Sequence, residues 1–354
     1  MVKYDLKLAY FRRVIKKIFF GLLVVLAILV IWNWSLVNYG IRQGLGQLDI
    51  VWNARPVQEF MNDPAFPDSL KTKLRLIDDI RNFAIDSLGL KDTKNYKTLY
   101  DQKNQEVMWV VQACEPFELK PKEWHFPIVG TVPYKGFFEK EKALTLSKEL
   151  EAQGYDVSVR NPGGWSTLGW FTDPILSGML DRSAGDLASL IIHEMVHATV
   201  FVKDDADFNE NLADFIGDTA AYHFLKHKFG AESKQYLDYL HSDQDYRKFT
   251  RHILRGTESL DSLYKSLKPE EAIEQKKEKK HSLIERIVIA MDTLHLYNQG
   301  GSHRMKKHLP NNTFFMSYRL YKSKQTVFGL ELNEKFKGDM RAYILYLTGK
   351  YPFL

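Results

Sequence analysis

The sequence predicts an α+β protein, in which an N-terminal transmembrane helix precedes one domain with a small mixed sheet and a mostly helical C-terminal half. Three observations lead to this fold class. An apolar run near the N-terminus is long enough to cross a bilayer, strand and helix patterns mix between residues 68 and 159, and helical spacing dominates from Ser183 onward. The composition, 45% hydrophobic and 26% charged over 354 residues, is ordinary for a globular protein and excludes a disordered or collagen-like chain.

The basic residues that set the net charge are concentrated in the first 17 residues. This tail holds six Lys or Arg and one acidic residue, Asp5, and its excess alone accounts for the net charge of +5. The rest of the chain is balanced in charge, which gives no support to a nucleic-acid partner. A single cysteine, Cys114, cannot form an intrachain disulfide and therefore excludes a disulfide-stapled fold.

Residues 18–37 form the apolar run and are predicted to be a transmembrane helix. Twenty residues at about 1.5 Å each reach about 30 Å, the thickness of a hydrocarbon core. Trp32 and Trp34 lie where an interfacial aromatic belt would be. A cleavable signal peptide is the alternative, but the run is long for one and no small-x-small site follows it. We therefore expect the segment to be retained as an anchor.

The charges around this segment predict its orientation. Six basic residues precede the span and only Arg42 closely follows it, so the N-terminus should stay in the cytoplasm. The expected organisation is a cytoplasmic basic tail over residues 1–17, a single span over residues 18–37, and one domain over residues 41–354 outside the cytoplasmic membrane. One domain is expected because no linker long enough to divide two cores follows the span.

Beyond the span, turn signals and apolar spacing predict a mixed region and then a largely helical one. The expected helices cover residues 68–88 and 139–153, and the expected strands cover residues 107–111 and 155–159. A long helical stretch is expected from Pro269 to Tyr297. The basic run Lys276–Lys280 within that stretch should be a solvated helix face and not a binding patch.

The most informative motif is His193-Glu-Met-Val-His197. Ser183 and Asp186 form a capping-box-like start, so a helix should run through both histidines. At about 100° per residue, the two imidazoles and the carboxylate of Glu194 share one helix face. Two imidazoles one turn apart can bind one zinc ion, while the carboxylate between them reaches metal-bound water and can act as its general base. The alternative is a set of polar residues on an exposed helix face.

A catalytic zinc site needs a third ligand. The candidates downstream are Asp204, Asp205, Asp207, Glu210, Asp214 and His223. Residues 207–221 are predicted to be a second helix with Asp207 as its N-cap, and Glu210 is the favoured ligand. Glu210, Asp214 and Gly217 fall on one face of that helix. Because Gly217 has no side chain, this face should be able to approach the first helix closely. Asp214, one turn beyond Glu210, would then hold a histidine as a hydrogen-bond acceptor.

The two motifs, His193-Glu-Met-Val-His197 and Asn209-Glu210-x-x-Ala213-Asp214, resemble those of the gluzincin zinc metallopeptidases. The wider sequence is similar to a bacterial family of zinc aminopeptidases, and the resemblance covers about residues 40–345. Its other recognisable pieces are Gly44–Asp49, Trp109–Ala113, Phe126–Gly136 and Ser166–Phe171. One departure is that no Gly-x-Met-Glu-Asn segment, which grips the substrate amine in the best-known gluzincin aminopeptidases, lies upstream. Aminopeptidase specificity therefore follows from the family resemblance and not from these residues.

The resemblance implies a single zinc ion held by His193, His197 and Glu210, with Glu194 as the catalytic base and Asp214 orienting the first histidine. In gluzincins an edge strand just upstream of the metal helix pairs with an extended peptide. The run after Asn161-Pro-Gly-Gly takes that place here, and its expected substrate-binding residues are Ser166, Thr167, Leu168 and Gly169. An ordinary edge strand with a bulge at the glycine is the alternative.

The side chain that stabilises the oxyanion is harder to identify. Candidate hydrogen-bond donors are Tyr134, Tyr222, His223, His303, Tyr318 and Tyr321. Tyr318 and Tyr321 rank first, because they follow Asn311-Asn312 in a segment that the resemblance also covers.

The sequence as a whole favours a membrane-anchored zinc peptidase acting on a peptide substrate. The expected location is the bacterial cytoplasmic membrane, with a single pass and the catalytic domain on the periplasmic or extracytoplasmic side. Two alternatives stay open. One is a zinc hydrolase acting on a non-peptide amide or a cell-wall substrate, and the other is a catalytically silent membrane-tethered binding module with structural zinc. The second would need a fourth ligand, and no spare cysteine or histidine stands at ligand spacing.

Overall fold

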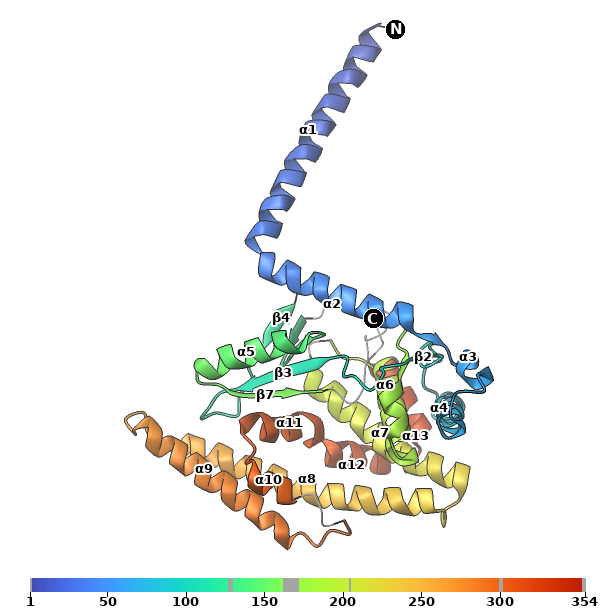
Figure 1. The fold of residues 1–354 in the computed structure, drawn as a ribbon, viewed down its shortest axis with the longest axis vertical. Helices are drawn as coiled ribbons and strands as arrows, with labels where there is room; N and C mark the ends of the chain where they lie inside the picture. The colour runs from blue at the N-terminus through green and yellow to red at the C-terminus, as the bar shows by residue number, and fades with distance from the viewer. Residues whose placement is uncertain (1, 127–129, 162–171, 204, 299–301, 352–354) are drawn as a thin grey trace. The chain divides into compact units, whose positions relative to one another are not determined.

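The computed structural model describes the chain except for residues 1, 127–129, 162–171, 204, 299–301 and 352–354 (Figure 1). The side chains of residues 2–10, 13, 302–304 and 321 are also not described. The chain divides into two compact units, residues 1–50 and 51–354. The protein is mixed α+β and mostly helical with small sheets, as the sequence predicts.

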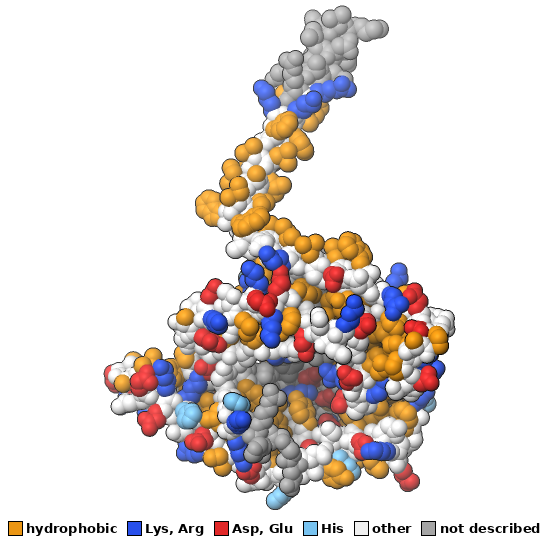
Figure 2. Space-filling view, in the orientation of Figure 1, with side chains coloured by type: hydrophobic (Ala, Val, Ile, Leu, Met, Phe, Trp, Pro, Cys, Tyr) orange, Lys and Arg blue, Asp and Glu red, His pale blue; other side chains and the backbone are white. Residues whose placement is uncertain are grey.

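The N-terminal unit is built from α1 (Val2–Trp32) and most of α2 (Trp34–Asn53). Within α1, Val14–Trp32 is long and apolar enough to cross a membrane, and a signal sequence would pass the same test. Figure 2 shows hydrophobic side chains along most of this helix and basic side chains toward its N-terminal end. The predicted span reaches residue 37, but α1 stops at Trp32. The side-chain amide of Asn33 donates to the Leu29 carbonyl at 2.9 Å there, and a new helix begins at Trp34.

The second unit contains three small sheets. In spatial order, the strands of the first sheet are β1 (Arg55–Pro56), β2 (Thr98–Tyr100) and β8 (Ile175–Leu176). The strands of the second sheet are β6 (Lys135–Phe137), β3 (Trp109–Cys114) and β7 (Asp156–Arg160). The third sheet pairs β4 (Trp124–Phe126) with β5 (Gly130–Val132). The second sheet is antiparallel, with Val111 opposite Val159. It contains the two predicted strands, each shifted toward its C-terminal end.

Helices make up most of the remainder. They are α3 (Val57–Asn62), α4 (Asp68–Asp86), α5 (Lys140–Ala152), α6 (Ala184–His197), α7 (Ala206–Phe229), α8 (Lys234–Ser266), α9 (Ile273–Ala290), α10 (Ser302–Lys307), α11 (Asn312–Lys322), α12 (Gln325–Phe336) and α13 (Met340–Lys350), with short 3-10 helices at Ser177–Asp181 and Met291–Thr293. The predicted helices over residues 68–88 and 139–153 are confirmed as α4 and α5. Helix α5 packs on β3 and β7, while α4, α7 and α8 pack on α6.

The long helix expected from Pro269 to Tyr297 is shorter in the structure. Its first residues form a turn, in which the Lys268 amide donates to the Glu271 carboxylate at 3.0 Å, and α9 begins only at Ile273. At the other end the chain tightens into a 3-10 turn and then becomes extended at Leu294. The segment is therefore a helix of 18 residues with ordered turns on both sides.

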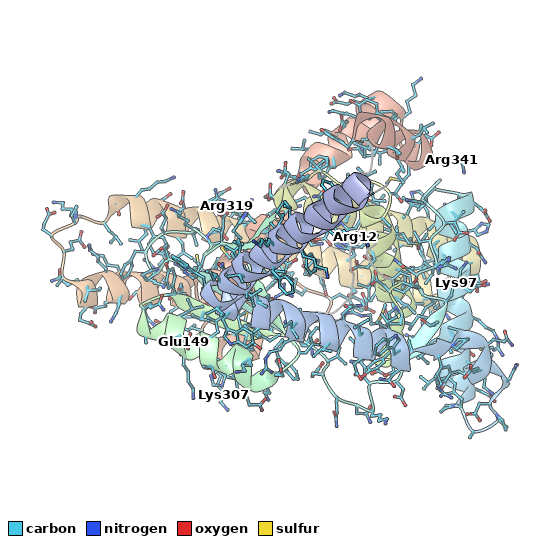
Figure 3. All side chains as sticks on the ribbon, turned by 90° about the horizontal axis from the view of Figure 1, so that it is seen from above. Arg12, Lys97, Glu149, Lys307, Arg319 and Arg341 are labelled. Atoms are coloured by element: carbon cyan, nitrogen blue, oxygen red, sulfur yellow. The ribbon has the colours of Figure 1, made fainter. Side chains whose placement is uncertain are left out.

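Lys280 corrects the expectation that the basic run on α9 is a solvated face. Most charged side chains do lie on the surface, among them Lys97, Glu149 and Lys307 (Figure 3). The Lys280 side chain, in contrast, is only 12% exposed and its ammonium lies 2.5 Å from the Asp156 carboxylate. The run has period 3.6 on a helix, so one of its lysines turns toward the sheet while Lys277 stays exposed.

The core of the second unit lies around α6 and α7, which form an antiparallel pair. Leu187 and Ile191 of α6 and Leu212 and Ile216 of α7 are fully buried. Gly217 lets the two helices touch, because a Cβ atom there would lie 2.7 Å from the Ser189 carbonyl oxygen and 3.3 Å from the Cβ of His193. The predicted small face of α7 therefore brings its backbone against the helix that carries the histidines.

Candidate metal centre

Helix α6 starts where the sequence predicts and turns both histidines to one side. The Ser183 hydroxyl accepts a hydrogen bond from the Asp186 amide at 3.1 Å and donates to the Asp186 carboxylate at 2.7 Å. The helix then runs from Ala184 to His197. Burial of its apolar face fixes its rotation, so His193 and His197, one turn apart, point in the same direction.

The start of α7 differs from the sequence prediction by two residues. Asp205, not Asp207, is the N-cap, and its carboxylate accepts from the Phe208 amide at 2.9 Å. Asp207 is already in the first turn, where it forms an ion pair with Lys324. Helix spacing alone does not reveal the loop contact that sets where α7 begins. The Asn209 side chain bonds both the amide and the carbonyl of Val202, at 2.8 and 2.7 Å, and so ties the loop between the helices to α7.

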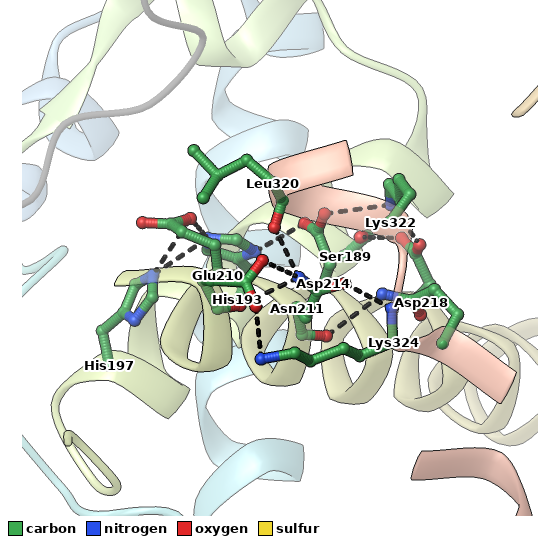
Figure 4. Close-up of polar contacts among 12 residues, drawn as sticks. Ser189, His193, His197, Glu210, Asn211, Asp214, Asp218, Leu320, Lys322 and Lys324 are labelled. Atoms are coloured by element: carbon green, nitrogen blue, oxygen red, sulfur yellow. Dashed lines mark hydrogen bonds and ion pairs between the residues drawn. The ribbon is translucent and has the colours of Figure 1, made fainter. Parts of the chain in front are cut away.

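The two helices bring His193, His197 and Glu210 together (Figure 4). The Nε2 atoms of the two histidines are 3.1 Å apart, and the Oε2 atom of Glu210 lies 3.5 Å from His193 Nε2 and 3.7 Å from His197 Nε2. One ligand atom from each residue lies within 4.8 Å of the others, so the group could hold a metal ion. Two imidazole nitrogens and one carboxylate fit the donor set of a catalytic zinc site, which leaves a coordination position open.

A second layer of charged groups supports His193 from behind. The Nδ1 atom of this histidine lies 2.9 Å from one carboxylate oxygen of Asp214, and the other carboxylate oxygen lies 3.1 Å from the Lys322 ammonium. Lys322, from α11, also pairs with Asp218 at 3.0 Å, and Asp218 accepts from the Ser189 hydroxyl at 2.7 Å. This chain of contacts fixes the ring orientation of the histidine and leaves its Nε2 atom directed at Glu210.

These contacts shift the pKa values of the metal-free site. Burial lowers the pKa of His193, but its bonds to Asp214 and Glu210 outweigh this and hold the pKa well above its usual range. Burial raises the pKa of Glu210, but hydrogen bonds from His193 and His197 outweigh it and lower the pKa. Burial likewise raises the pKa of Asp214, while His193 and Lys322 bring it below its usual range. The pocket thus favours a positive charge between its carboxylates, as a metal-binding site does.

Glu194 lies between the histidines in sequence and is not part of the His–His–Glu group. Its Oε2 atom is buried and has no hydrogen-bond partner among the described residues, and the same holds for Nδ1 of His197. A buried carboxylate oxygen without a partner is costly and uncommon in a folded protein. Glu194 is therefore a free acceptor beside the candidate metal group.

Most of the other candidate residues lie outside the described part of the chain, are exposed, or make contacts unrelated to the His–His–Glu group. The expected substrate-binding residues, Ser166 to Gly169, lie outside the described residues, as does Asp204, and the side chains of His303 and Tyr321 are not described. His223 is exposed. The Tyr222 hydroxyl donates to Asp243. Tyr318 packs its ring against Phe314 and Phe249, with centroids 5.0 and 5.7 Å apart, in an aromatic cluster formed by α8 and α11.

Among the tyrosine candidates whose side chains are described, Tyr134 is the one whose pKa depends on the charges of the site. Burial raises its pKa to about 12, and the charges of Glu210 and Glu194 add to this. The sequence favours Tyr318 and Tyr321 because they follow Asn311-Asn312, but nearness along the chain does not indicate nearness to the site in space. The support from Lys322 was not anticipated either, since this lysine lies 108 positions after Asp214 and belongs to no motif.

Comparison with protein-family models matches residues 38–347 to the family described as "Putative aminopeptidase". The match covers most of the chain and includes both helices of the metal group. The comparisons with curated proteins and with solved structures give no match.

Proposed function

The chain belongs to the family described as "Putative aminopeptidase", and we propose that it is a zinc-dependent peptidase whose metal is held by His193, His197 and Glu210. The family supports peptidase activity in general. The observation that carries the rest is the convergence of two imidazoles and one carboxylate from two helices in backbone contact. Beside them, the buried Oε2 atom of Glu194 has no partner among the described residues. The substrate is a peptide, and the family description favours removal of residues from its N-terminus.

In this proposal each residue of the site has a defined task. His193, His197 and Glu210 would hold the zinc ion, which would supply a Lewis acid for activating water and polarising the scissile carbonyl. Glu194 accepts the proton of the attacking water and passes it to the leaving amine, for which its free, buried carboxylate oxygen is suited. Asp214 holds His193 through Nδ1, so that the Nε2 atom stays directed at the site.

Replacing the base tests this assignment. In the full-length chain, Glu194→Gln should retain zinc but lose about 10²–10⁴-fold in turnover of a peptide library, the usual scale for a general base. Glu285→Gln makes the same chemical change on the exposed face of α9 and is the matched control. Zinc content and turnover are measured on the same samples. Undiminished turnover by the Glu194 variant would dismiss this base, and cleavage only of non-peptide amides would redirect the substrate class.

We further propose that α1 anchors the chain in a bacterial cytoplasmic membrane, with the catalytic unit outside the cytoplasm. The support is the apolar stretch Val14–Trp32 and the excess of basic residues before it. A cysteine introduced at the exposed position Ser266, in a chain without Cys114, should react with a membrane-impermeant thiol reagent added to intact spheroplasts. Labelling that requires the cytoplasm to be opened would reverse the orientation, and a chain released from the membrane fraction would point to a cleaved signal sequence.

A further inference from the structure

Tyr96 combines two unusual features within the second unit. Its side chain is only 4% exposed, yet its hydroxyl has no hydrogen-bond partner among the described residues. Its backbone is in the left-handed region, with φ of 61°. A bulky residue rarely adopts this conformation, and a buried hydroxyl without a partner is unfavourable. Such features persist where surrounding structure imposes them, and they gather at functional sites.

Hydrogen bonds to Asp173 hold Tyr96 in this conformation. The Tyr96 amide donates to the Asp173 carbonyl at 2.8 Å. The neighbouring Asn95 accepts from the Asp173 amide at 3.0 Å and donates to its carboxylate at 3.3 Å. Asn95 and Asp173 are both buried, so this three-bond clamp is protected from water. The backbone conformation of Tyr96 is therefore set by neighbours and not by its own preference.

The segment that carries Tyr96 is tied to the end of the helix that bears Glu194. The Lys91 amide donates to the Thr199 hydroxyl at 3.1 Å, and that hydroxyl donates to the Met195 carbonyl at 2.7 Å. On the other side, the buried Arg81 donates to the Thr93 carbonyl at 2.9 Å. The segment is thus fixed both to α4 and to the last turns of α6.

The bond from the Lys91 amide to Thr199 brings the segment of Tyr96 to the end of the helix that carries Glu194. After burial, the charge of Glu194 is the largest contribution that raises the pKa of the Tyr96 phenol. Among the residues that the structure describes, the buried Oε2 atom of Glu194 lacks a donor and the buried hydroxyl of Tyr96 lacks an acceptor. Each group can supply what the other lacks. Hydrogen bonds of catalytic groups are often long in an unloaded site and shorten when it is loaded.

We propose that Tyr96 is a positioning residue for Glu194: its hydroxyl donates to the carboxylate and fixes the direction from which the other oxygen meets the attacking water. The effect on catalysis rests on the proposed function, whereas the hydrogen bond between Tyr96 and Glu194 does not depend on it. The hydrogen bonds to Asp173 hold the Tyr96 backbone in place, so its hydroxyl could fix the orientation of the Glu194 carboxylate. A hydroxyl on a mobile segment could not do so.

The contact can be tested without a substrate. In the zinc-loaded chain, Tyr96→Phe should lower the melting temperature when Glu194 is present and raise it when Glu194 is replaced by Ala, because the hydroxyl then has no partner to lose. Tyr264→Phe is the matched control, because its hydroxyl donates to Asn312 at 2.6 Å; it should lower the melting temperature equally in both backgrounds. Equal effects of Tyr96→Phe in the two backgrounds, including no effect in either, would overturn the contact.

The catalytic consequence is tested by steady-state kinetics on a peptide that the wild-type chain cleaves. Tyr96→Phe should lower kcat about 10–100-fold with KM and zinc content unchanged, as the loss of an orienting partner does, while Tyr264→Phe should leave kcat unaltered. In the Glu194→Gln background, measured by single turnover, Tyr96→Phe should cause no further loss. A full additional loss there would show that Tyr96 acts on the substrate and not through Glu194. Absence of peptide cleavage by the wild type would reject the proposed function while the melting experiment still decides the contact.

Discussion

Two of the largely buried polar clusters in the second unit differ in how completely their atoms are paired. We call them the His193 cluster (His193, His197, Glu210, Asp214 and Lys322, beside Glu194) and the Asp156 cluster (Asp156, Lys280, Asn312 and Tyr264). In the Asp156 cluster, the carboxylate accepts from the Lys280 ammonium at 2.5 Å and the Asn312 amide at 2.8 Å. The Asn312 side chain accepts from Tyr264 at 2.6 Å and donates to the Glu115 carbonyl at 2.8 Å.

The Asp156 cluster has no partnerless side-chain atom among those that the structure describes, whereas the His193 cluster has two at its edge, on His197 and Glu194. Buried polar groups are normally satisfied, so a closed network joins elements of the fold, here β7, α8, α9 and α11. Open atoms beside a dense charge cluster leave capacity for a ligand. The difference separates a structural cluster from a candidate reactive one without reference to any motif.

The largest expected effect is on zinc affinity, and it should differ between residues of the His193 cluster. Glu210→Gln should abolish tight zinc binding, because it removes the only carboxylate of the candidate ligand set. Asp214→Asn should keep the metal but weaken affinity or activity about 10–100-fold, as outer partners of metal ligands do. Competitive zinc titration of both variants measures this, with Asp205→Asn and Asp207→Asn as controls at the start of α7. Normal zinc binding by the Glu210 variant together with loss in an aspartate variant would replace the ligand set.

A smaller effect is expected in the Asp156 cluster, and on stability alone. Lys280→Met leaves a carboxylate that is only 17% exposed with a single donor, which should cost about 2–3 kcal/mol after allowing for partial solvation. Lys277→Met on the same helix breaks an exposed pair with Glu274 and should cost less than about 0.5 kcal/mol. Urea unfolding gives both values. Turnover per folded molecule should be unchanged in each, and a loss of turnover in the Lys280 variant would blur the distinction between the clusters.

The smallest effect is a difference in pH dependence between the metal-free and the zinc-loaded chain. Because the pKa of His193 is raised in the metal-free site, its contribution to stability is complete below about pH 6.5 and is lost as pH rises through the raised pKa. The lowered pKa of Glu210 makes a contribution that is constant over this range. Zinc needs neutral His193, so its binding strengthens as pH rises.

Melting temperatures measured with chelator and with excess zinc, from about pH 6 to about pH 8.5, should therefore change in opposite directions. The metal-free value should fall and the zinc-loaded value should rise. In the metal-free Asp214→Asn variant the fall should be shallower, since one of the groups that raises the pKa of His193 has lost its charge. Parallel slopes in the two wild-type samples would show that His193 does not share its pocket with the metal.

Local patterns in the sequence predict much of the fold and part of the candidate site. Helix α6, its Ser183 cap, the single face of His193 and His197, and the close approach at Gly217 all follow from spacing within one or two helices. Contacts between distant segments could not be predicted in this way. Lys322 meets Asp214, Lys280 meets Asp156 and Lys91 meets Thr199 only because the tertiary fold brings them together. Left-handed backbone at a tyrosine has no signal in the sequence, since glycine is the residue that usually marks it.

The backbone contact at Gly217 has a consequence for how the site meets its metal. Because the Ser189 carbonyl and His193 lie against this glycine, α6 and α7 cannot move closer together there to suit a smaller ion. A metal ion bound here would meet a preorganised group of three side chains, ordered when the chain folds and not when the ion arrives. Such a chelator selects ions by size and geometry more strictly than one built on loops.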